Sequence, residues 1–258
     1  MPAGRLRSAQ RPAEERHASP IAIRAWAVAS GRRRILAHLG LLSILSGGRS
    51  VAAEPAGNER VSTRIEGQRS APQILVLGDS WSAEYGLRRG KGWVALLEQR
   101  LAERPEFKRF QVVNASLSGE TTAGGLSRVE ALLEKHRPRI LVIALGGNDA
   151  LRGLSLDLAR TQLAQMIDKG KRSGAQVLLI GMRLPPNYGR YAKDFEAIYP
   201  ALAKQEKVAL VPFLMAGIEE DISRFQADRI HPGEAAQAHM LEQAWPSLEK
   251  LLLRSVQK

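Results

Sequence analysis

Four separate stretches of the sequence contain the residue types that a serine nucleophile needs. Ser80 stands directly after an apolar run, and a late Asp-x-x-His pair, Asp228 and His231, could supply a general base and the carboxylate that orients it. Gly119 could offer a backbone N–H, and Asn148 a side-chain amide, to a developing oxyanion. In combination these groups fit acyl transfer through a covalent intermediate.

The histidines leave little choice for the base. Residues 54–258 contain three of them. His136 ends a predicted helix and is expected in solvent, while His239 falls within the last predicted helix and is expected to pack or to lie at the surface. His231 stands in a loop before that helix, where Asp228 can fold back within the same turn and fix its tautomer.

Each of these residues also has a purely structural explanation. Ser80 could cap a helix, and Gly119 could be a turn glycine. Asn148 could form an Asx turn, and Asp228 could be a surface acid. Taken singly, each structural explanation is the stronger one. Taken together, the catalytic explanation prevails, because three successive strand ends and the late Asp-x-x-His supply every group that the chemistry requires.

Alternating apolar patterns predict the elements that must position these groups. Short apolar runs typical of buried strands alternate with longer amphipathic stretches at helical spacing. This alternation predicts a parallel sheet with helices on both faces, a three-layer α/β/α fold. The expected strands are residues 74–78, 110–114, 140–145, 176–180 and 208–211, and the expected helices are residues 92–103, 121–136, 156–172, 190–206 and 233–253.

The carboxyl ends of the first three predicted strands are rich in Gly, Ser, Asn and Asp. They comprise residues 78–80, 114–119 and 146–149. Because ligands of parallel α/β sheets bind at this edge, we expect the candidate residues to meet there.

Several other chemistries are excluded by the composition and the motifs. The chain has no cysteine, so it has no disulfide, thiolate metal site or cysteine nucleophile. It lacks the G-x-S-x-G elbow, a phosphate-binding loop and a G-x-G-x-x-G after a strand. We therefore expect neither a metal nor a cofactor.

The excess positive charge is concentrated at the amino terminus. The 258 residues carry a net charge of +12, of which residues 1–53 hold +7 and the rest +5. An arginine triplet at 32–34 precedes the apolar run 35–45, and small residues end at Ala53. This order predicts a secretory signal cleaved before Glu54; an uncleaved membrane anchor or a buried helix are the alternatives.

The predicted signal divides the chain into three parts. Residues 1–53 would hold an N-terminal extension and the signal peptide, 54–71 a flexible polar lead-in, and 72–258 a single globular domain. The run 35–45 is too short for a bilayer, which needs about 20 residues. We therefore expect a periplasmic or secreted protein with no stable membrane span in its mature form.

The polar blocks resemble those of the SGNH (GDSL-type) hydrolase family. They are Gly78-Asp79-Ser80, Gly119, Gly146-Gly147-Asn148-Asp149 and Asp228-x-x-His231-Pro232. The branch of that family with thioesterase and lysophospholipase activity is similar in four further stretches, residues 113–121, 145–153, 183–189 and 198–204. The resemblance runs from about residue 73 to the last predicted helix.

This resemblance implies a fold and a set of roles. The sheet would be flavodoxin-like, with five parallel strands in the order 2-1-3-4-5. Ser80 would be the nucleophile, His231 the general base and then acid, and Asp228 the orienting carboxylate. The backbone N–H groups of Ser80 and Gly119 and the side chain of Asn148 would form the oxyanion hole.

The resemblance also implies a substrate class. A monomer would hydrolyse fatty acyl esters, including acyl-CoA thioesters, lysophospholipids and aryl esters, and a loop at 150–155 would move when the acyl chain binds. Trp81 departs from the family, which has Leu after the serine; its ring could narrow the acyl site, stack on an aryl ester or merely pack beneath the first helix. The residues implied to contact substrate are Asp79, Trp81, Ala150, Leu151, Arg152, Pro185 and Tyr188.

Two other functions remain open on the sequence. A carbohydrate acetylesterase would use the same fold and the same catalytic residues. A cationic protein that binds membranes or nucleic acid would use the surplus Lys and Arg, but the +5 beyond residue 53 includes no basic run with interleaved aromatics. We therefore expect a small-molecule ester as the partner and no nucleic acid.

Overall fold

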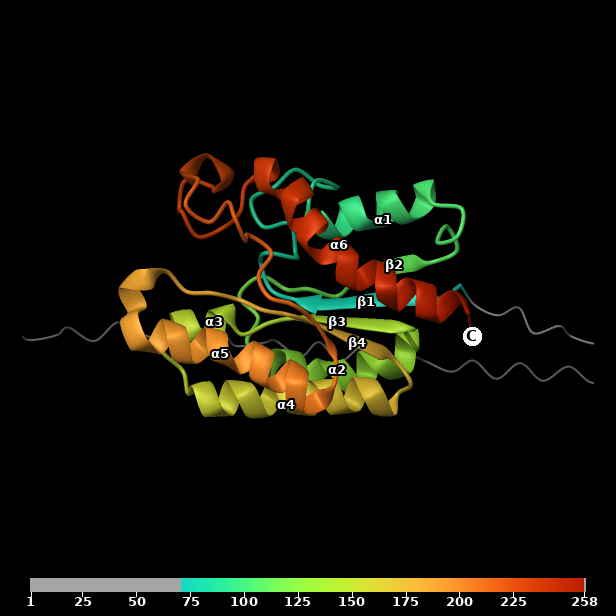
Figure 1. The fold of residues 1–258 in the computed structure, drawn as a ribbon, viewed down its shortest axis with the longest axis horizontal. Helices are drawn as coiled ribbons and strands as arrows, with labels where there is room; N and C mark the ends of the chain where they lie inside the picture. Colours follow the sequence, from blue (N-terminus) through green and yellow to red (C-terminus); the bar gives the residue numbers. More distant parts are fainter. Residues whose placement is uncertain (1–70, 258) are drawn as a thin grey trace, which may run out of the picture. The chain divides into compact units, whose positions relative to one another are not determined.

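Strands and helices alternate along the described part of the chain. The computed structural model describes residues 71–257 (Figure 1). The strands are β1 (Gln73–Gly78), β2 (Gln111–Asn114), β3 (Ile140–Ala144), β4 (Gln176–Ile180) and β5 (Ala209–Val211). The helices are α1 (Trp93–Glu103), α2 (Thr122–His136), α3 (Gly147–Leu151), α4 (Leu156–Arg172), α5 (Gly189–Glu206) and α6 (Glu234–Val256), with 3-10 turns η1 (Pro186–Tyr188) and η2 (Ile222–Arg224).

The strands form one parallel sheet in the order β2-β1-β3-β4-β5, which confirms the predicted topology. The inner strands β1, β3 and β4 are buried on both faces, because nearly all their residues are apolar. The register pairs Val76 with Asn114 and Gly78 with Ala144. The loops after β1, β2 and β3 therefore leave the sheet at one edge.

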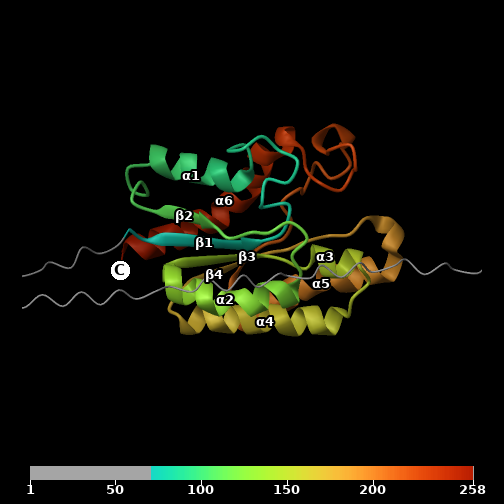
Figure 2. The ribbon, with the colours of Figure 1, turned by 180° about the vertical axis from the view of Figure 1, so that it is seen from behind.

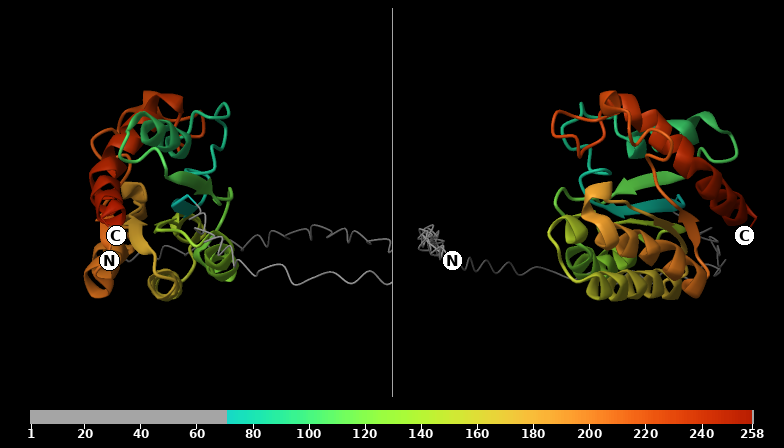
Figure 3. Two further views of the ribbon diagram at one scale, coloured as in Figure 1. Left: turned by 90° about the vertical axis from the view of Figure 1, so that its right-hand side faces the viewer. Right: turned by 60° about the vertical axis from the view of Figure 1, so that its left-hand side comes forward.

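Helices cover both faces of this sheet. Figures 1 and 2 show α1 and α6 on one face and α2, α4 and α5 on the other, and Figure 3 shows the strands between these layers. The N–H of Trp93 donates to Oε1 of Gln237 at 3.0 Å, and Arg100 forms an ion pair with Glu242. These contacts join α1 to α6, so the first and last helices of the described chain form one layer.

The predicted element boundaries differ from the observed ones by at most three residues. The exception is α3, which was not predicted: residues 146–149 were expected at a strand end and residues 150–155 in a loop. Ala150 and Leu151 belong to this short helix, and Ser155 caps α4 by accepting the N–H of Leu158 at 3.3 Å. A helix of five residues is too short to display a helical apolar period.

The predicted extension and signal, residues 1–53, lie outside the described residues, as does the predicted lead-in up to residue 70. Of the predicted globular domain, 72–258, the structure describes residues 72–257. Between residues 71 and 257, none of the helices combines the length and the apolar character needed to cross a membrane.

Candidate active site

Ser80 lies in the turn after β1 and faces a histidine from near the other end of the chain. Its Oγ is 2.9 Å from Nε2 of His231, although 151 residues separate the two. Gly78 permits the tight approach at the end of β1, since a Cβ there would lie 2.8 Å from Oγ of Ser82 and 3.0 Å from Oγ of Ser116. The pair has the geometry of a nucleophile beside its base.

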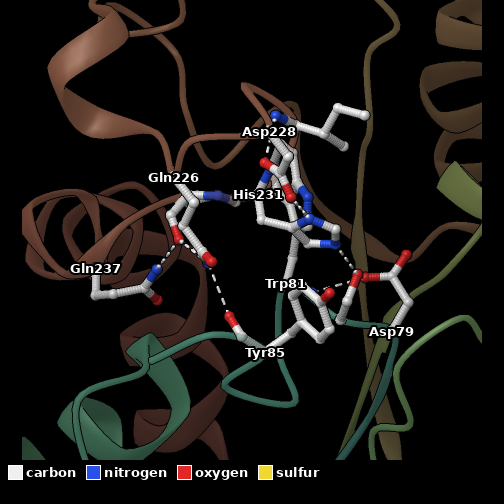
Figure 4. Close-up of polar contacts among 10 residues, drawn as sticks. Asp79, Trp81, Tyr85, Gln226, Asp228, His231 and Gln237 are labelled. Carbon is white, nitrogen blue, oxygen red and sulfur yellow. Dashed lines mark hydrogen bonds and ion pairs between the residues drawn. The ribbon is translucent and has the colours of Figure 1, made fainter. Parts of the chain in front are cut away.

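Asp228 holds the other nitrogen of the imidazole. Its Oδ2 is 2.7 Å from Nδ1 of His231, and its Oδ1 accepts the backbone N–H groups of His231 at 3.0 Å and Ile230 at 2.9 Å (Figure 4). The backbone bond from His231, with that from Ile230 and the ring contact, lowers the pKa of Asp228 to about 2. The ionised carboxylate favours a proton on Nδ1 and leaves Nε2 free to accept one from Ser80.

Gly119 lies in the loop after β2. The N–H of Leu117 donates to the carbonyl of Gly78 at 3.0 Å, which places this loop against the end of β1. Gly119 has φ +79°, a conformation that favours glycine, and its carbonyl accepts Nη2 of Arg152 at 3.0 Å. The contact with Arg152 fixes the orientation of this carbonyl.

Asn148 is presented by α3. Its Nδ2 donates to the backbone carbonyl of Glu120 at 3.0 Å and lies 3.4 Å from Oδ2 of Asp79. The side chain therefore lies between the residue after Gly119 and the residue before Ser80. The structure thus brings the three predicted oxyanion-hole residues into one region.

A buried acid anchors α3 from behind. Asp149 accepts the N–H of Thr122 at 2.9 Å and its hydroxyl at 2.6 Å. The side-chain amide of Gln162 lies 2.6 Å from the same hydroxyl. Through these bonds the helix that carries Asn148 is tied to α2 and α4.

Asp79 is buried next to Ser80. It is 3 % exposed, and its Oδ1 accepts the N–H of Trp81 at 3.1 Å. Burial raises the pKa of this carboxyl to about 7; the bond from Trp81 opposes the shift, and the negative charges of Asp149 and Glu120 add to it. A carboxyl with that pKa changes its charge near neutral pH, within reach of the Asn148 amide.

Three of the predicted substrate contacts lie in α3 or directly after it, and they differ in exposure. Leu151 is 39 % exposed and Arg152 is also exposed, whereas Ala150 is fully buried in the core. A contact between Ala150 and a substrate would therefore require α3 to move. Leu151 and Arg152 are accessible at the surface, and Arg152 is bonded to the carbonyl of Gly119.

The other predicted contact residues lie in two separate loops. Trp81 is half-buried, and the centroid of its ring is 6.0 Å from that of Phe213. Pro185 directly precedes the turn η1 and Tyr188 is its last residue, and both are exposed. Trp81 thus packs against the segment after β5.

Sequence reasoning missed side chains that contact the loop of His231. The ring of Tyr85 lies 4.4 Å from the imidazole between centroids, and Nε2 of Gln226 donates to the carbonyl of Tyr85 at 2.8 Å (Figure 4). The buried Gln237 donates to the carbonyl of Gly233 at 3.2 Å. None of these residues belongs to a recognisable motif, so no signal in the sequence singled them out.

The candidate catalytic groups are a serine hydroxyl, one imidazole and two carboxyls. Ser80, His231 and Asp228 form a continuous hydrogen-bonded chain, with Asp79 beside it. In the range 71–257 there is no group of three or more His, Asp or Glu side chains placed to hold a metal ion. The available chemistry is proton transfer coupled to attack by a serine oxygen.

Known proteins resemble this chain over most of its described part. Residues 76–239 match the model of the GDSL-like Lipase/Acylhydrolase family. The chain is 51 % identical to Esterase TesA of Pseudomonas aeruginosa over 186 residues, which cover 72 % of this chain and 92 % of that protein. It is 40 % identical to Thioesterase 1/protease 1/lysophospholipase L1 of Escherichia coli over 184 residues, which cover 71 % of this chain and 86 % of that protein.

Solved structures are similar to this chain in fold as well as in sequence. The crystal structure of TesA matches with a TM-score of 0.67 at 50 % identity, over 69 % of this chain and 99 % of the other. That of the psychrotrophic esterase EstA from Pseudoalteromonas sp. matches with a TM-score of 0.66 at 35 % identity, over 70 % and 98 %. These likenesses confirm the family that the four sequence blocks predict: the chain belongs to the GDSL-like lipase/acylhydrolase family.

Proposed function

We propose that the protein is a serine hydrolase that cleaves fatty acyl esters and thioesters through an acyl-enzyme on Ser80. One observation carries the proposal: Ser80 Oγ, the His231 ring and Asp228 are joined in series at 2.9 Å and 2.7 Å. The relatives are named as esterase, thioesterase, lysophospholipase and arylesterase, which supports ester bonds as the target.

In the proposed mechanism Ser80 Oγ attacks the acyl carbonyl and passes its proton to Nε2 of His231. Asp228 stabilises the imidazolium, which then protonates the departing alcohol or thiol. Water, deprotonated by His231, hydrolyses the acyl-enzyme and frees Ser80.

The oxyanion of each tetrahedral intermediate would be held by the N–H groups of Ser80 and Gly119 and by Nδ2 of Asn148. Both N–H directions of that amide are already engaged, at 3.0 Å with Glu120 and at 3.4 Å with Asp79. We assign the longer contact, to Asp79, as the one that the oxyanion replaces, since it is the weaker of the two.

The acyl chain would lie on the apolar surface around the strand ends. Leu117 is exposed on the loop that carries Gly119, and Leu151 is exposed on the helix α3 that carries Asn148. The proposed substrate contacts are Trp81, Leu151, Arg152, Pro185 and Tyr188, with Asp79 acting through Asn148 and Ala150 packing behind Leu151.

The Ser80→Ala variant tests the chemistry, and a series of p-nitrophenyl esters tests the substrate. Ser80→Ala is expected to abolish hydrolysis, while Ser127→Ala, an exposed serine on α2 bonded to the carbonyl of Gly124, is expected to retain it. Activity retained by Ser80→Ala would overturn the assignment. Faster turnover of octanoyl to dodecanoyl esters supports the acyl function, whereas a preference for acetyl esters would favour the carbohydrate acetylesterase alternative.

We further propose that the chain acts as a monomer after export to the periplasm or beyond, with cleavage between Ala53 and Glu54. The arginine triplet, apolar run and small residues of the leader support export. Cell fractionation and N-terminal sequencing of the mature protein test this, and a mature chain that begins at Met1 would contradict it. Size-exclusion chromatography tests the monomer.

A further inference from the structure

The imidazole of His231 has a neighbour besides Ser80 and Asp228. The ring of Tyr85 packs against it, with centroids 4.4 Å apart and planes tilted by 40°. Tyr85 and Ser80 lie in the loop after β1, whereas His231 precedes α6. The stacked rings therefore join the loop of the proposed nucleophile to the loop of the proposed base.

Gln226 ties the same two loops together through their backbones. Its Nε2 donates to the carbonyl of Tyr85 at 2.8 Å and to that of Pro232 at 3.2 Å, and its own N–H donates to the carbonyl of His231 at 2.8 Å (Figure 4). The absence of a side chain at Gly86 makes room for this, since a Cβ there would lie 2.0 Å from Oε1 of Gln226. One amide thus fixes carbonyls on both loops.

We propose that Tyr85 and Gln226 are positioning residues that hold His231 at hydrogen-bond distance from Ser80. The proposal rests on the proposed function, because it concerns the activation of Ser80. Gln226 sets the separation of the two loops. Tyr85 keeps the ring in place and presents an aromatic face to the imidazolium that forms when Ser80 gives up its proton.

The position of Asp228 explains why further contacts are needed to hold His231 beside Ser80. Asp228 and His231 belong to one loop, three residues apart, so their bond orients the imidazole but leaves the distance between that loop and Ser80 free. A misplacement of about 1 Å at a reacting group can cost about 100-fold in rate. Gln226 and Tyr85 supply the missing constraint, because their contacts cross from one loop to the other.

A second connection between the same segments lies farther out. Arg88 forms an ion pair with Glu234 at 2.6 Å, and 77 % of the Arg88 side chain is exposed. An exposed pair of this kind contributes little rigidity, since solvent and salt weaken it. The contacts of Gln226 and Tyr85 combine hydrogen bonds with ring packing and involve no ion pair, so they have the larger part in fixing the His231 loop.

The first test compares Tyr85→Phe with Tyr85→Leu. The phenylalanine keeps the stacked ring and is expected to retain kcat within about twofold. The leucine removes the ring and is expected to lower kcat about three- to tenfold with KM nearly unchanged, the range that one aromatic contact supplies. Phosphorylation of Ser80 by diethyl p-nitrophenyl phosphate, which needs no acyl groove, is expected to slow in the same proportion.

The second test removes the side-chain hydrogen-bond donors of Gln226 without adding a charge. Gln226→Met is close in shape and is expected to lower kcat about 10- to 100-fold. Gln165→Met, the same change at an exposed position of α4, serves as the control and is expected to match the wild type. The double variant Tyr85→Leu/Gln226→Met is expected to lose less than the product of the single losses, because both residues act on His231.

The outcomes separate this inference from the proposed function. A lowered kcat in Tyr85→Leu and Gln226→Met, with a nearly normal kcat in Tyr85→Phe, supports the positioning role of the two residues. A changed KM that varies with acyl-chain length would overturn it, since Tyr85 would then be a substrate contact. A wild-type kcat in both Tyr85→Leu and Gln226→Met would also overturn the positioning role, while hydrolysis that depends on Ser80 would leave the proposed function intact. If Gln226→Met does not fold, the comparison of Tyr85→Phe with Tyr85→Leu decides alone. A wild-type enzyme without Ser80-dependent hydrolysis would instead reject the proposed function.

Discussion

Replacing Asp79 by Asn tests whether burial of this carboxyl makes the fold sensitive to pH. The pKa of Asp79 is about 7 in the folded protein and 3.8 as the ordinary value, so the folded state holds the proton more tightly. The stability that Asp79 contributes is therefore fully present below pH 3.8 and is lost as the pH rises through 7. The variant, which has no titratable group at this position, lacks this dependence.

The size of the effect follows from those two pKa values. Between pH 5 and pH 8, Asp79 is expected to remove about 2–3 kcal/mol from the free energy of unfolding of the wild type. The asparagine also carries a penalty, because Trp81 and Asn148 both donate to Asp79 and an amide accepts through one atom only. That mismatch costs about 1–3 kcal/mol at every pH, so it cancels when each protein is compared with itself at two pH values.

Urea unfolding followed by tryptophan fluorescence measures this difference, because Trp93 and Trp245 are buried in the described fold. The wild type is expected to lose about 2–3 kcal/mol more than Asp79→Asn between pH 5 and pH 8, since the other titrations are common to both. Asp194→Asn, an exposed acid on α5, is the control and is expected to follow the wild type. Parallel curves for Asp79→Asn and the wild type would refute the reasoning.

Three further substitutions have expected outcomes. Asn148→Ala is expected to lower kcat about 10²- to 10³-fold in ester hydrolysis with a smaller change in KM, because it removes one oxyanion donor. Thr122→Val leaves Asp149 without the bond from that hydroxyl, at 2.6 Å, and is expected to lower the free energy of unfolding in urea by about 1–3 kcal/mol. Gly146→Ala places a Cβ 2.4 Å from Oη of the buried Tyr199 at φ +118°, and is expected to lower it by about 3 kcal/mol or more.

Each of these expectations has an outcome that contradicts it. An Asn148→Ala enzyme with normal kcat would remove that residue from the oxyanion hole. For Thr122→Val the control is Thr161→Val on α4, whose hydroxyl bonds the carbonyl of Asp157 at the exposed surface. Equal stability of the two threonine variants, or an unchanged melting temperature for Gly146→Ala, would contradict the packing argument.

Much of the fold was predictable because its signals are local. The runs that became β1, β3 and β4 are apolar throughout, which is typical of strands covered on both faces. Since the ends of parallel strands meet at one edge, the sequence alone places Ser80, Gly119 and Asn148 together. The Asp-x-x-His spacing likewise predicted the contact of Asp228 with His231, which the structure contains at 2.7 Å.

The unpredicted features depend on contacts between distant segments. Nothing in the sequence near Tyr85 indicates that its ring packs on His231, because that contact exists only after β1 and α6 are assembled. Gln226 gave no signal for the same reason, since its partners are backbone carbonyls. The raised pKa of Asp79 depends on its burial, which sequence reasoning did not assign.

The contact between Ser80 and His231 also has a consequence for how the protein folds. It spans 151 residues, and Trp93 of α1 receives its partner Gln237 only from α6. Folds dominated by such distant pairings form slowly, because long loops must close before the contacts stabilise them. A chain whose last part has not yet been synthesised therefore contains Ser80 without His231, its proposed base. Activity should return with the slowest phase of refolding, which makes catalysis itself a reporter that the last helix has docked.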